Sequence, residues 1–392
     1  MKVLLISPNF HPKLGGIESH LIELIQSLKD IKFAVLTTWR RGIDQVASAL
    51  PDVDFHFVWP SDRPLRKWFA RSQVSLRPYR LLVATVEMLR SINRRAWLRR
   101  IDADIFHFQF LELDQLDRVA SRFGLGKLIP MWYRWAVGPT KDGTATLLTD
   151  HTVFTASREI VPEETKRALL EVFRNIVSVD AKSFEVVQAF QRRHQGRSWF
   201  IPNSVDTKLF TDNRKPHEGF RVGFAGRVGK LGRDLLESVA AQLGSEVQWY
   251  FAVAGEDFDV NRTRLLSAAP KAKLYPNLSY ARMPEFYSSL DLLVNPFPGE
   301  GIGRTTLEAM SCGVPVVCVG TGDKYPIRNE YTGYLLPPDP SLIAKEILNL
   351  KRNPELLTLM GRRAREAIAS EFSNAVVFPK LRSVYAAIAR VA

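Results

Sequence analysis

The stretch at residues 296–319, PFPGEGIGRTTLEAMSCGVPVVCV, decides the fold of this chain. A loop rich in proline and glycine leads through Gly301 and Gly303 into an expected helix over residues 304–312. After the break at Gly313 an apolar strand is expected over residues 316–319. Free backbone N–H groups and the positive end of the helix dipole make such a helix start an anion site, and glycine lets a ligand approach the backbone. The stretch therefore predicts an α/β unit that binds an anion at this helix.

Two carboxylates flank the predicted anion site, Glu300 before the helix and Glu308 inside it. Their eight-residue spacing places the two backbones roughly 12 Å apart if the segment is mostly helical. The carboxyl groups of a glycosidase pair lie closer, at about 5 to 9.5 Å. We interpret the pair as holding two separated parts of one long ligand, with a phosphate between them, as in a nucleotide sugar. Spacing alone equally allows a solvated helix residue and an ordinary loop acid.

The pattern from Glu300 to Glu308, followed by AMSCGVPVV at residues 309–317, resembles the signature of the family 4 glycosyltransferases of GT-B fold. Five further motifs follow the order of that family and extend along nearly the whole chain: GGIE at 15–18, DHT at 150–152, IPNSVD at 201–206, GR at 226–227 and TGYL at 332–335. Each motif alone is weak, but six in register are specific. The resemblance implies a retaining, nucleotide-sugar-dependent transferase.

The resemblance also implies roles for the residues of the second half. Glu300 would bind the sugar hydroxyls as a catalytic residue, and Glu308 would accept hydrogen bonds from the ribose. Whether Glu300 is also a nucleophile stays open, because a front-face route needs no protein base. The full donor-binding set expected is Gly16, Arg227, Lys230, Gly301, Ile302, Gly303, Thr305 and Glu308.

Family members clamp the diphosphate with an arginine and a lysine from the turn after the first strand of this domain. Arg227 matches the arginine, but Leu231 stands directly before Gly232 where the lysine is expected. Lys230 is our substitute and Arg233 is its rival. Guanidinium and ammonium groups are the usual phosphate partners, and they would replace a metal ion here. The sequence contains no His/Cys ligand cluster, so we expect no metal and no other cofactor.

The first half begins with a strand, a loop and a helix in the Rossmann pattern, with Gly15 and Gly16 at the helix entrance. The glycines do not form G-x-G-x-x-G, so the dinucleotide fingerprint is absent. The resemblance implies acceptor binding at Gly15 and Glu18. His151 follows an expected strand at its carboxyl end, where open α/β sheets bind ligands. In the family this position contacts the donor sugar, which makes His151 a predicted catalytic-site residue, whereas His107 is expected to be packed.

The bulk composition is that of a globular protein with 46% hydrophobic and 24% charged residues. The two cysteines, Cys312 and Cys318, are too few for a disulfide framework, which favours a reducing compartment. Residues 1–7 read as a first strand rather than a signal peptide, and no apolar run approaches 18 residues. We therefore expect a cytoplasmic enzyme.

The formal charge of +13 is concentrated in residues 63–100, where eleven basic residues face one acid, Glu87. Tryptophan and leucine are mixed with the Arg and Lys residues, a composition typical of a helix on an anionic membrane surface. A core helix with a basic solvated face fits equally well. Nucleic acid is a weaker reading and is not expected as a partner, because no nucleic-acid motif accompanies the charge.

These observations predict an α/β, GT-B architecture of two Rossmann-like doubly wound domains that face each other across a cleft. The expected acceptor domain covers residues 1–200, with a final helix at 375–392 packing back on it, and the expected nucleotide-sugar domain covers residues 201–374. The expected reaction moves a hexosyl group from a nucleoside-diphosphate sugar to a hydroxyl of a glycan or lipid-linked acceptor, at the cytoplasmic face of a membrane. Two alternatives remain, a nucleotide-sugar hydrolase or epimerase on the same fold, and a non-enzymatic basic α/β protein that binds membranes or polyanions.

Overall fold

The computed structural model describes residues 1–10, 15–38, 40–60, 76–109, 117, 120, 124–138, 144–156, 161–227, 230–254, 258–297, 301–320 and 324–390. The chain divides into two compact units, one of Met1–Pro202 with Phe378–Ala392 and one of Asn203–Val377. The boundary expected from sequence, between residues 200 and 201, lies two residues from this division.

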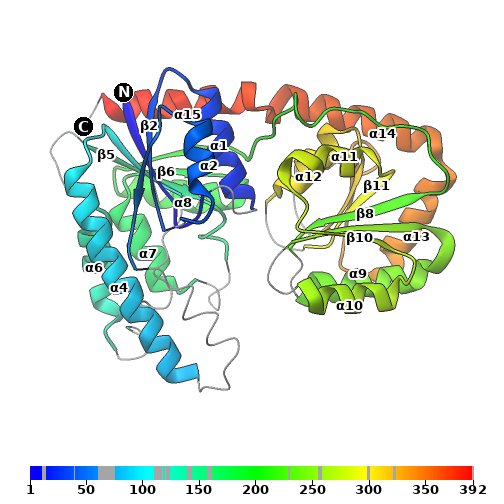
Figure 1. Cartoon of the computed structure of the whole chain (residues 1–392), viewed down its shortest axis with the longest axis horizontal. Helices are drawn as coiled ribbons and strands as arrows, with labels where there is room; N and C mark the ends of the chain where they lie inside the picture. The colour runs from blue at the N-terminus through cyan, green and yellow to red at the C-terminus, as the bar shows by residue number, and fades with distance from the viewer. Residues whose placement is uncertain are drawn as a thin grey trace. The chain divides into compact units, whose positions relative to one another are not determined.

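The first unit contains a seven-stranded parallel sheet (Figure 1). Its order across the sheet is β3 (Asp54–Phe57), β2 (Lys32–Thr37), β1 (Lys2–Ile6), β4 (Ile105–Phe108), β5 (Ala145–Asp150), β6 (Asn175–Ser178) and β7 (Arg197–Phe200). The inner strands are mostly apolar and buried because both faces of a parallel sheet are covered by helices.

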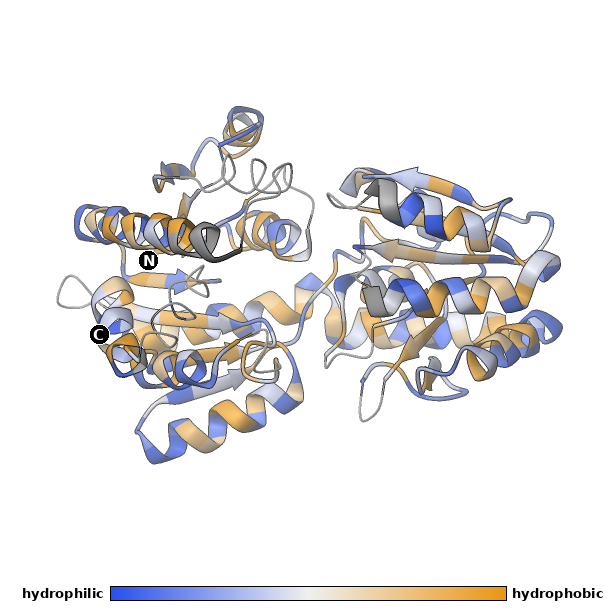
Figure 2. Ribbon diagram, turned by 90° about the horizontal axis from the view of Figure 1, so that it is seen from below, coloured by the Kyte–Doolittle hydropathy of each residue, from blue (hydrophilic) through white to orange (hydrophobic). Residues whose placement is uncertain are grey.

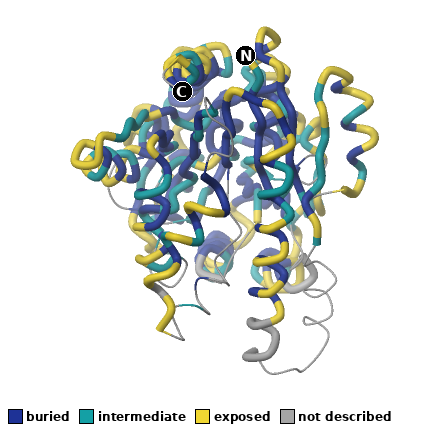
Figure 3. Tube along the Cα trace, turned by 90° about the vertical axis from the view of Figure 1, so that its left-hand side faces the viewer, coloured by how far each residue is buried: buried dark blue, intermediate teal, exposed yellow. Residues whose placement is uncertain are grey.

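Helices cover both faces of this first sheet. One face packs its core against α4 (Leu76–Arg100), α6 (Ile129–Val137), α7 (Glu163–Val172) and α8 (Ala181–Arg193). A short 3-10 turn, η1 (Gly126–Leu128), precedes α6. The remaining helices of the unit are α1 (Gly16–Ser27), α2 (Ile43–Ala49) and the end of α15 (Asn374–Ala389). Figure 3 shows the buried strands inside and exposed residues on the outward helical turns.

The second unit contains a six-stranded parallel sheet. Its order is β10 (Lys273–Pro276), β9 (Gln248–Val253), β8 (Arg221–Gly226), β11 (Leu292–Asn295), β12 (Val316–Val319) and β13 (Gly333–Leu336). One face packs on α9 (Lys230–Leu243), α10 (Phe258–Ala268) and α13 (Pro340–Arg352). The other packs on α11 (Met283–Ser288) and α12 (Arg304–Ser311) (Figure 1). α14 (Pro354–Ala367) adds residues to both cores, and a π-helical turn, η4 (Ile368–Phe372), follows it.

Each sheet has a switch point, where successive strands change the direction in which they are added. In the first unit β1 and β4 are neighbours there, and in the second unit β8 and β11 are. Ligands of open α/β sheets bind outside the carboxyl ends of the strands at such points. A ligand-binding site is therefore expected at the residues that follow β1, β4, β8 and β11.

The C-terminal helix returns to the first unit. Phe378 packs edge-on against His20 of α1, and Arg382 forms an ion pair with Asp30 across 2.7 Å. Deeper in the helix, the Tyr385 hydroxyl lies 2.7 Å from Nδ1 of the buried His107 on β4. The helix that the sequence placed at residues 375–392 is therefore part of the first core.

Apolar and polar residues alternate along most helices, as Figure 2 shows, and each helix turns its apolar side to a sheet. Among the described helices, none combines the length and the apolar character needed to cross a bilayer.

Candidate functional site

The switch point of the second sheet brings two of the predicted donor-binding elements together. Gly226 ends β8, and a Cβ built on it would lie 3.9 Å from Cγ2 of Thr305 in the first turn of α12. Gly232, in α9, lies against Phe297, which follows β11. The turn after β8 and the start of α12 therefore meet at one edge of the sheet, as the sequence motifs required.

The start of α12 has the backbone geometry expected of an anion site. Gly301 has a φ of 77°, the left-handed region that favours glycine, and Gly303 is the N-cap of the helix. The carbonyl of Ile302 accepts a hydrogen bond from Asn203 Nδ2 across 3.1 Å. This bond ties the loop to the residue that begins the second unit, so the first N–H groups of α12 are held in place.

Glu308 is a buried residue of α12, which excludes the solvated helix residue that spacing alone allowed. Its Oε2 accepts a hydrogen bond from the Tyr287 hydroxyl across 2.9 Å, and its Oε1 lies 3.7 Å from Arg304 Nε. Arg304 also donates to the Tyr280 hydroxyl across 2.7 Å. Burial, followed by the charge of Glu308, raises the pKa of Tyr287 well above its usual value, so the phenol stays a donor.

The predicted cations of the donor site differ in how they are placed. Arg227 follows β8 and is exposed. Lys230 is the first residue of α9, which begins three residues earlier than expected, and its side chain lies outside the described residues. Arg233 donates to Asn261 Oδ1 across 2.9 Å and lies 3.8 Å from Glu237. These contacts hold Arg233 against α9 and α10.

Sequence reasoning missed several residues that shape this edge of the sheet. The buried Lys324 donates to the carbonyls of Phe297 and Val319, each across 2.8 Å, and so joins the ends of β11 and β12. Asn295 donates to Thr306 Oγ1 across 2.8 Å. Glu300, predicted to be catalytic, lies outside the described residues.

No group of three or more His, Cys, Asp or Glu side chains that would hold a metal ion occurs in the part of the chain that the structure describes. Cys312 and Cys318 are buried free thiols. Burial raises the pKa of Cys318 to about 11 and that of Cys312 to about 12, so neither is a thiolate at neutral pH.

At the switch point of the first sheet, Gly15 is the N-cap of α1 and Gly16 begins the helix. The Glu18 carboxylate is buried and folds back over the helix start, where a Cβ on Gly15 would lie 2.1 Å from its Oε2. Gly15 and Glu18, the two predicted acceptor residues, are therefore in contact.

His151 follows β5 in a fixed turn. Asp150 Oδ1 accepts from the backbone N–H of Val153 across 2.7 Å, its Oδ2 accepts from the Ser183 hydroxyl, and Thr152 has a φ of 66°. Burial raises the pKa of Asp150 to about 6. The imidazole of His151 lies 3.1 Å from Gln109 Oε1, and burial lowers its pKa to about 4. His151 is therefore neutral at physiological pH.

His107 is packed, as expected from sequence, but it also holds polar neighbours that the sequence did not indicate. It is fully buried, with Tyr385 Oη 2.7 Å from its Nδ1 and Thr149 Oγ1 2.7 Å from its Nε2. Gln109 Nε2 lies 3.0 Å from His107 Nε2, so Gln109 joins His107 to His151. His107 is on β4 and Gln109 directly follows it, and this two-residue spacing, which favours one face of the sheet, is the sequence signal for the pair.

The basic segment is partly buried, contrary to a uniformly solvated basic face. Arg90 and Arg94 on α4 are buried, and Arg90 donates to the carbonyl of Pro60 across 3.2 Å. Arg95 is half-buried and donates to the carbonyl of Gly138 across 2.6 Å. Burial, with the nearby charge of Arg99, lowers the pKa of Arg95. These three arginines therefore stabilise α4 from inside, while the rest of the segment before residue 76 lies outside the described residues.

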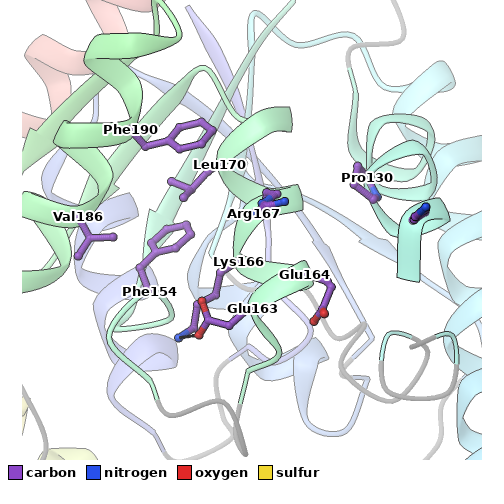
Figure 4. Close-up of a pocket in the computed structure, with 10 residues that line it drawn as sticks. Pro130, Phe154, Glu163, Glu164, Lys166, Arg167, Leu170, Val186 and Phe190 are labelled. Carbon is purple, nitrogen blue, oxygen red and sulfur yellow. Dashed lines mark hydrogen bonds and ion pairs between the residues drawn. The ribbon is translucent and has the colours of Figure 1, made fainter. Parts of the chain in front are cut away.

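A cavity of about 500 Å³ opens between α6, α7 and α8 (Figure 4). Figure 4 shows Phe154, Leu170 and Phe190 gathered on one side of α7. The charged residues of its lining are Lys127, Lys166 and Arg167 together with the acids Glu163 and Glu164. Phe154 is three residues after His151, so this cavity adjoins the turn that carries the predicted catalytic histidine.

The chain is similar in sequence and in structure to several known proteins. Residues 219–353 match the family model described as "Glycosyl transferases group 1". The chain is 27% identical over 336 residues to the lipopolysaccharide core biosynthesis mannosyltransferase LpsB of Rhizobium meliloti (strain 1021), a match that covers 82% of this chain and 78% of LpsB. Sucrose-phosphate synthase from Thermosynechococcus elongatus is similar with a TM-score of 0.73 and 16% identity over the whole of both chains. HepE of Anabaena, crystallised with UDP-glucose, has a TM-score of 0.67 and 16% identity over 99% of this chain and all of that one.

The structural matches establish the fold alone, and they confirm the GT-B class that the sequence predicted. Neither a nucleotide-sugar hydrolase or epimerase nor a non-enzymatic binding protein is favoured by the matches. The GT-B fold and the glycosyl transferases group 1 domain at residues 219–353 together support a glycosyltransferase.

Proposed function

We propose that this chain is a retaining family 4 glycosyltransferase that moves a hexosyl group from a nucleoside-diphosphate sugar to an acceptor hydroxyl. One observation carries the proposal. At the switch point of the second sheet, Gly226 lies against Thr305 at the start of α12, and the buried Glu308 stands one turn further along that helix. An anion-binding helix start followed by a carboxylate suits a diphosphate followed by a ribose.

In this proposal the diphosphate lies at the start of α12. The backbone N–H groups of residues 301–303 and the hydroxyl of Thr305 would donate to its oxygens, and Arg227 and Lys230 would neutralise its charge. The same groups would stabilise the diphosphate as it leaves. The reaction is therefore proposed to need no metal ion.

Glu308 is proposed to accept hydrogen bonds from the ribose hydroxyls. Tyr287 and Arg304 hold its carboxylate on two sides and so keep it in one position. Preorganised in this way, it would lose little conformational freedom when a ligand binds.

Glu300 and His151 are proposed to contact the sugar. In a front-face transfer, the bond from the anomeric carbon to the diphosphate oxygen breaks while the bond to the acceptor oxygen forms on the same face. The acceptor proton passes to the leaving diphosphate, so configuration is retained without a protein base. A neutral His151 is suited to a hydrogen bond with a sugar hydroxyl, not to carrying charge.

The acceptor is proposed to be a glycan or a lipid-linked glycan precursor, by analogy with LpsB, whose name assigns it to lipopolysaccharide core biosynthesis. The UDP-glucose in HepE supports a nucleotide sugar as donor. Gly15 and Glu18 remain the proposed acceptor contacts. The cavity beside Phe154 offers an apolar wall and the cations Lys127 and Arg167 to an amphipathic acceptor.

We also propose that the enzyme works at the cytoplasmic face of an anionic membrane. Because Arg90 and Arg94 point inward, the surface proposed for lipid contact is an exposed apolar face on α4 and α6, two helices that pack against each other. We call it the α4/α6 surface; its apolar members are Leu82, Met88, Leu89, Ile92, Leu128, Met131 and Trp135, and its exposed cations are Arg99, Arg100, Lys127 and Arg134. Apolar side chains mixed with cations are typical of proteins that lie on anionic bilayers.

The test of the proposed reaction is a transfer assay with a panel of UDP-, GDP- and ADP-sugars and glycan acceptors, with and without EDTA. We expect transfer from one donor class, unaffected by EDTA, and a product of retained anomeric configuration. Glu300→Ala should reduce kcat strongly while free nucleotide still binds. Rapid turnover of donor without any acceptor would instead indicate a hydrolase, and equal loss of nucleotide binding in Glu300→Ala would contradict the role of Glu300.

A further inference from the structure

Gln109 lies between the predicted catalytic histidine and a buried histidine in the first unit. It follows β4 directly, and its backbone N–H donates to the carbonyl of Ile6 across 2.9 Å, so its position is fixed by the sheet. Its side chain is buried. The amide oxygen lies 3.1 Å from His151 Nε2, and the amide nitrogen lies 3.0 Å from His107 Nε2.

The amide oxygen of Gln109 can only accept a hydrogen bond, so its contact assigns a proton to His151 Nε2. A neutral imidazole carries one N–H, so the lone pair of His151 is then on Nδ1. The amide nitrogen of Gln109 lies 3.0 Å from Nε2 and 3.4 Å from Nδ1 of His107, so it faces the ring of His107. Thr149 Oγ1 lies 2.7 Å from His107 Nε2, and the Tyr385 hydroxyl lies 2.7 Å from His107 Nδ1. These two hydroxyls hold the ring against which the Gln109 amide nitrogen rests.

Both histidines are neutral at physiological pH, so each imidazole ring carries a single N–H. Burial, followed by the charge of His151, lowers the pKa of His107 to about 3, and burial lowers the pKa of His151 to about 4. Tyr385 from α15 contacts the ring of His107, and Asp150, the last residue of β5, directly precedes His151. Burial also raises the pKa of Tyr385 well above its usual value, so the Tyr385 side chain stays a neutral phenol.

The backbone around His151 is fixed independently of its ring. Asp150 holds the N–H of Val153, and Thr152 occupies the left-handed region. The remaining freedom of His151 is the rotation and the tautomer of its imidazole. Gln109 contacts Nε2 of His151, and this contact fixes both the rotation and the tautomer of the ring.

We infer that Gln109, seated by His107 and by Tyr385 of the C-terminal helix, is a positioning residue that fixes His151 as the Nε2–H tautomer and leaves Nδ1 as a hydrogen-bond acceptor. Resting on the proposed function, this makes His151 an acceptor for a donor-sugar hydroxyl. Reversing the Gln109 amide would place its nitrogen against His151 Nε2, so that His151 would present Nδ1–H instead. The two states differ in a property that can be measured without any substrate.

The test is nitrogen NMR of full-length protein labelled with [15N]histidine, at pH 7, with the His151 signals assigned by their loss in His151→Asn. We expect a protonated Nε2 and an unprotonated Nδ1 for His151 in the wild type. Gln109→Leu should give mixed tautomers, and Tyr385→Phe should shift the His107 and His151 signals. Tyr133→Phe removes a different buried hydroxyl, which donates to Asp117 in the same unit, and should leave the His151 signals unchanged.

A wild-type His151 protonated at Nδ1, or an unchanged tautomer in Gln109→Leu, overturns the inference. In the transfer assay Gln109→Leu should lower kcat by roughly three- to tenfold with little change in donor KM. Gln109→Glu, whose carboxylate would raise the pKa of His151, should restore activity at high pH and lose it as the pH falls. The expected tautomer without any sugar transfer would leave the assignment of Gln109 intact and remove the proposed function, whereas transfer with the opposite tautomer would do the reverse.

Discussion

The Tyr287 hydroxyl donates to Glu308 Oε2 across 2.9 Å in the core of the second unit. Tyr287 comes from α11 and Glu308 from α12, so the bond joins the two helices that cover one face of the sheet. Arg304 Nε lies 3.7 Å from the other oxygen of the same carboxylate. The carboxylate of Glu308 is therefore held between a donor from α11 and a cation from its own helix.

Tyr287→Phe removes this hydrogen bond and keeps the ring. Bonds to charged groups contribute more than neutral ones, so we expect the free energy of unfolding to fall by about 2 kcal/mol. Nucleotide affinity should fall severalfold because Glu308 loses its fixed position. Urea denaturation and calorimetric titration with nucleoside diphosphates measure the two effects. Tyr133→Phe, in the first unit, should lower stability and leave nucleotide affinity unchanged; equal loss of affinity in both variants would contradict the role of Tyr287.

Gly301→Ala tests the start of α12. A non-glycine residue in the left-handed region costs about 1–2 kcal/mol, and the φ of 77° at Gly301 requires that region. Gly124 has a φ of 72° with open space around its Cβ position, so Gly124→Ala is a matched control. We expect similar losses of stability in the two variants. Binding of a nucleoside diphosphate should be lost in Gly301→Ala alone. Full nucleotide binding by Gly301→Ala would show that the diphosphate lies elsewhere.

The buried His107 predicts how stability depends on pH. Its pKa is lowered in the folded state to about 3. Below about pH 6.5 the imidazole is therefore protonated in the unfolded chain but stays neutral in the folded chain. Stability is therefore lost as the pH falls, and lowering the pH from 7 to 5 should cost about 2 kcal/mol through this residue. Asp150, with its raised pKa, acts in the opposite direction and partly offsets the loss.

His107→Gln isolates that contribution. The variant should be less stable at pH 7, but the difference in its unfolding free energy between pH 7 and pH 5 should be smaller than in the wild type by about 2 kcal/mol. His194→Gln, at an exposed position, should leave the difference unchanged. An unaltered pH dependence in His107→Gln would mean that His107 is not held neutral.

The α4/α6 surface predicts the membrane behaviour. Ile92→Glu places a charge in the apolar surface at a residue that is 47% exposed, so the fold should be kept while binding to anionic liposomes falls. Val186→Glu, at a 44% exposed position on α8, is the matched control and should bind as the wild type does. Replacing Arg99 and Arg100 with glutamine should weaken binding by about 1 kcal/mol for each charge. Cosedimentation that is unchanged in Ile92→Glu would remove the proposed surface.

Much of the fold was predictable because its strands are short apolar runs bounded by glycine and proline. The first strand, the strand before Gly226 and the strand delivering the loop at residue 296 all lie within a few residues of their expected bounds. α10 (Phe258–Ala268) was missed because its apolar residues lack helical periodicity. The start of α9 was placed three residues late because the glycine in LGR was read as part of a loop, whereas it packs inside the helix on Phe297.

The site was predictable where its residues end or follow strands at a switch point of a sheet. The meeting of Gly226 with Thr305 follows from motif order and the switch-point rule. The contact of His107 with Tyr385 joins residues 278 positions apart, and no local pattern specifies it. The burial of Arg90 and Arg94 could not be predicted either, because a basic composition does not show which arginines are hydrogen-bonded inside the unit.

The most direct test of the central claim is calorimetric titration of the full-length protein with UDP-, GDP- and ADP-sugars, beside Arg227→Ala and Glu308→Gln. We predict that one class of nucleotide sugar binds the wild type at a single site, and that each substitution weakens this binding at least tenfold while the protein stays folded. Binding of no nucleotide sugar, or binding that neither substitution weakens, would contradict the account.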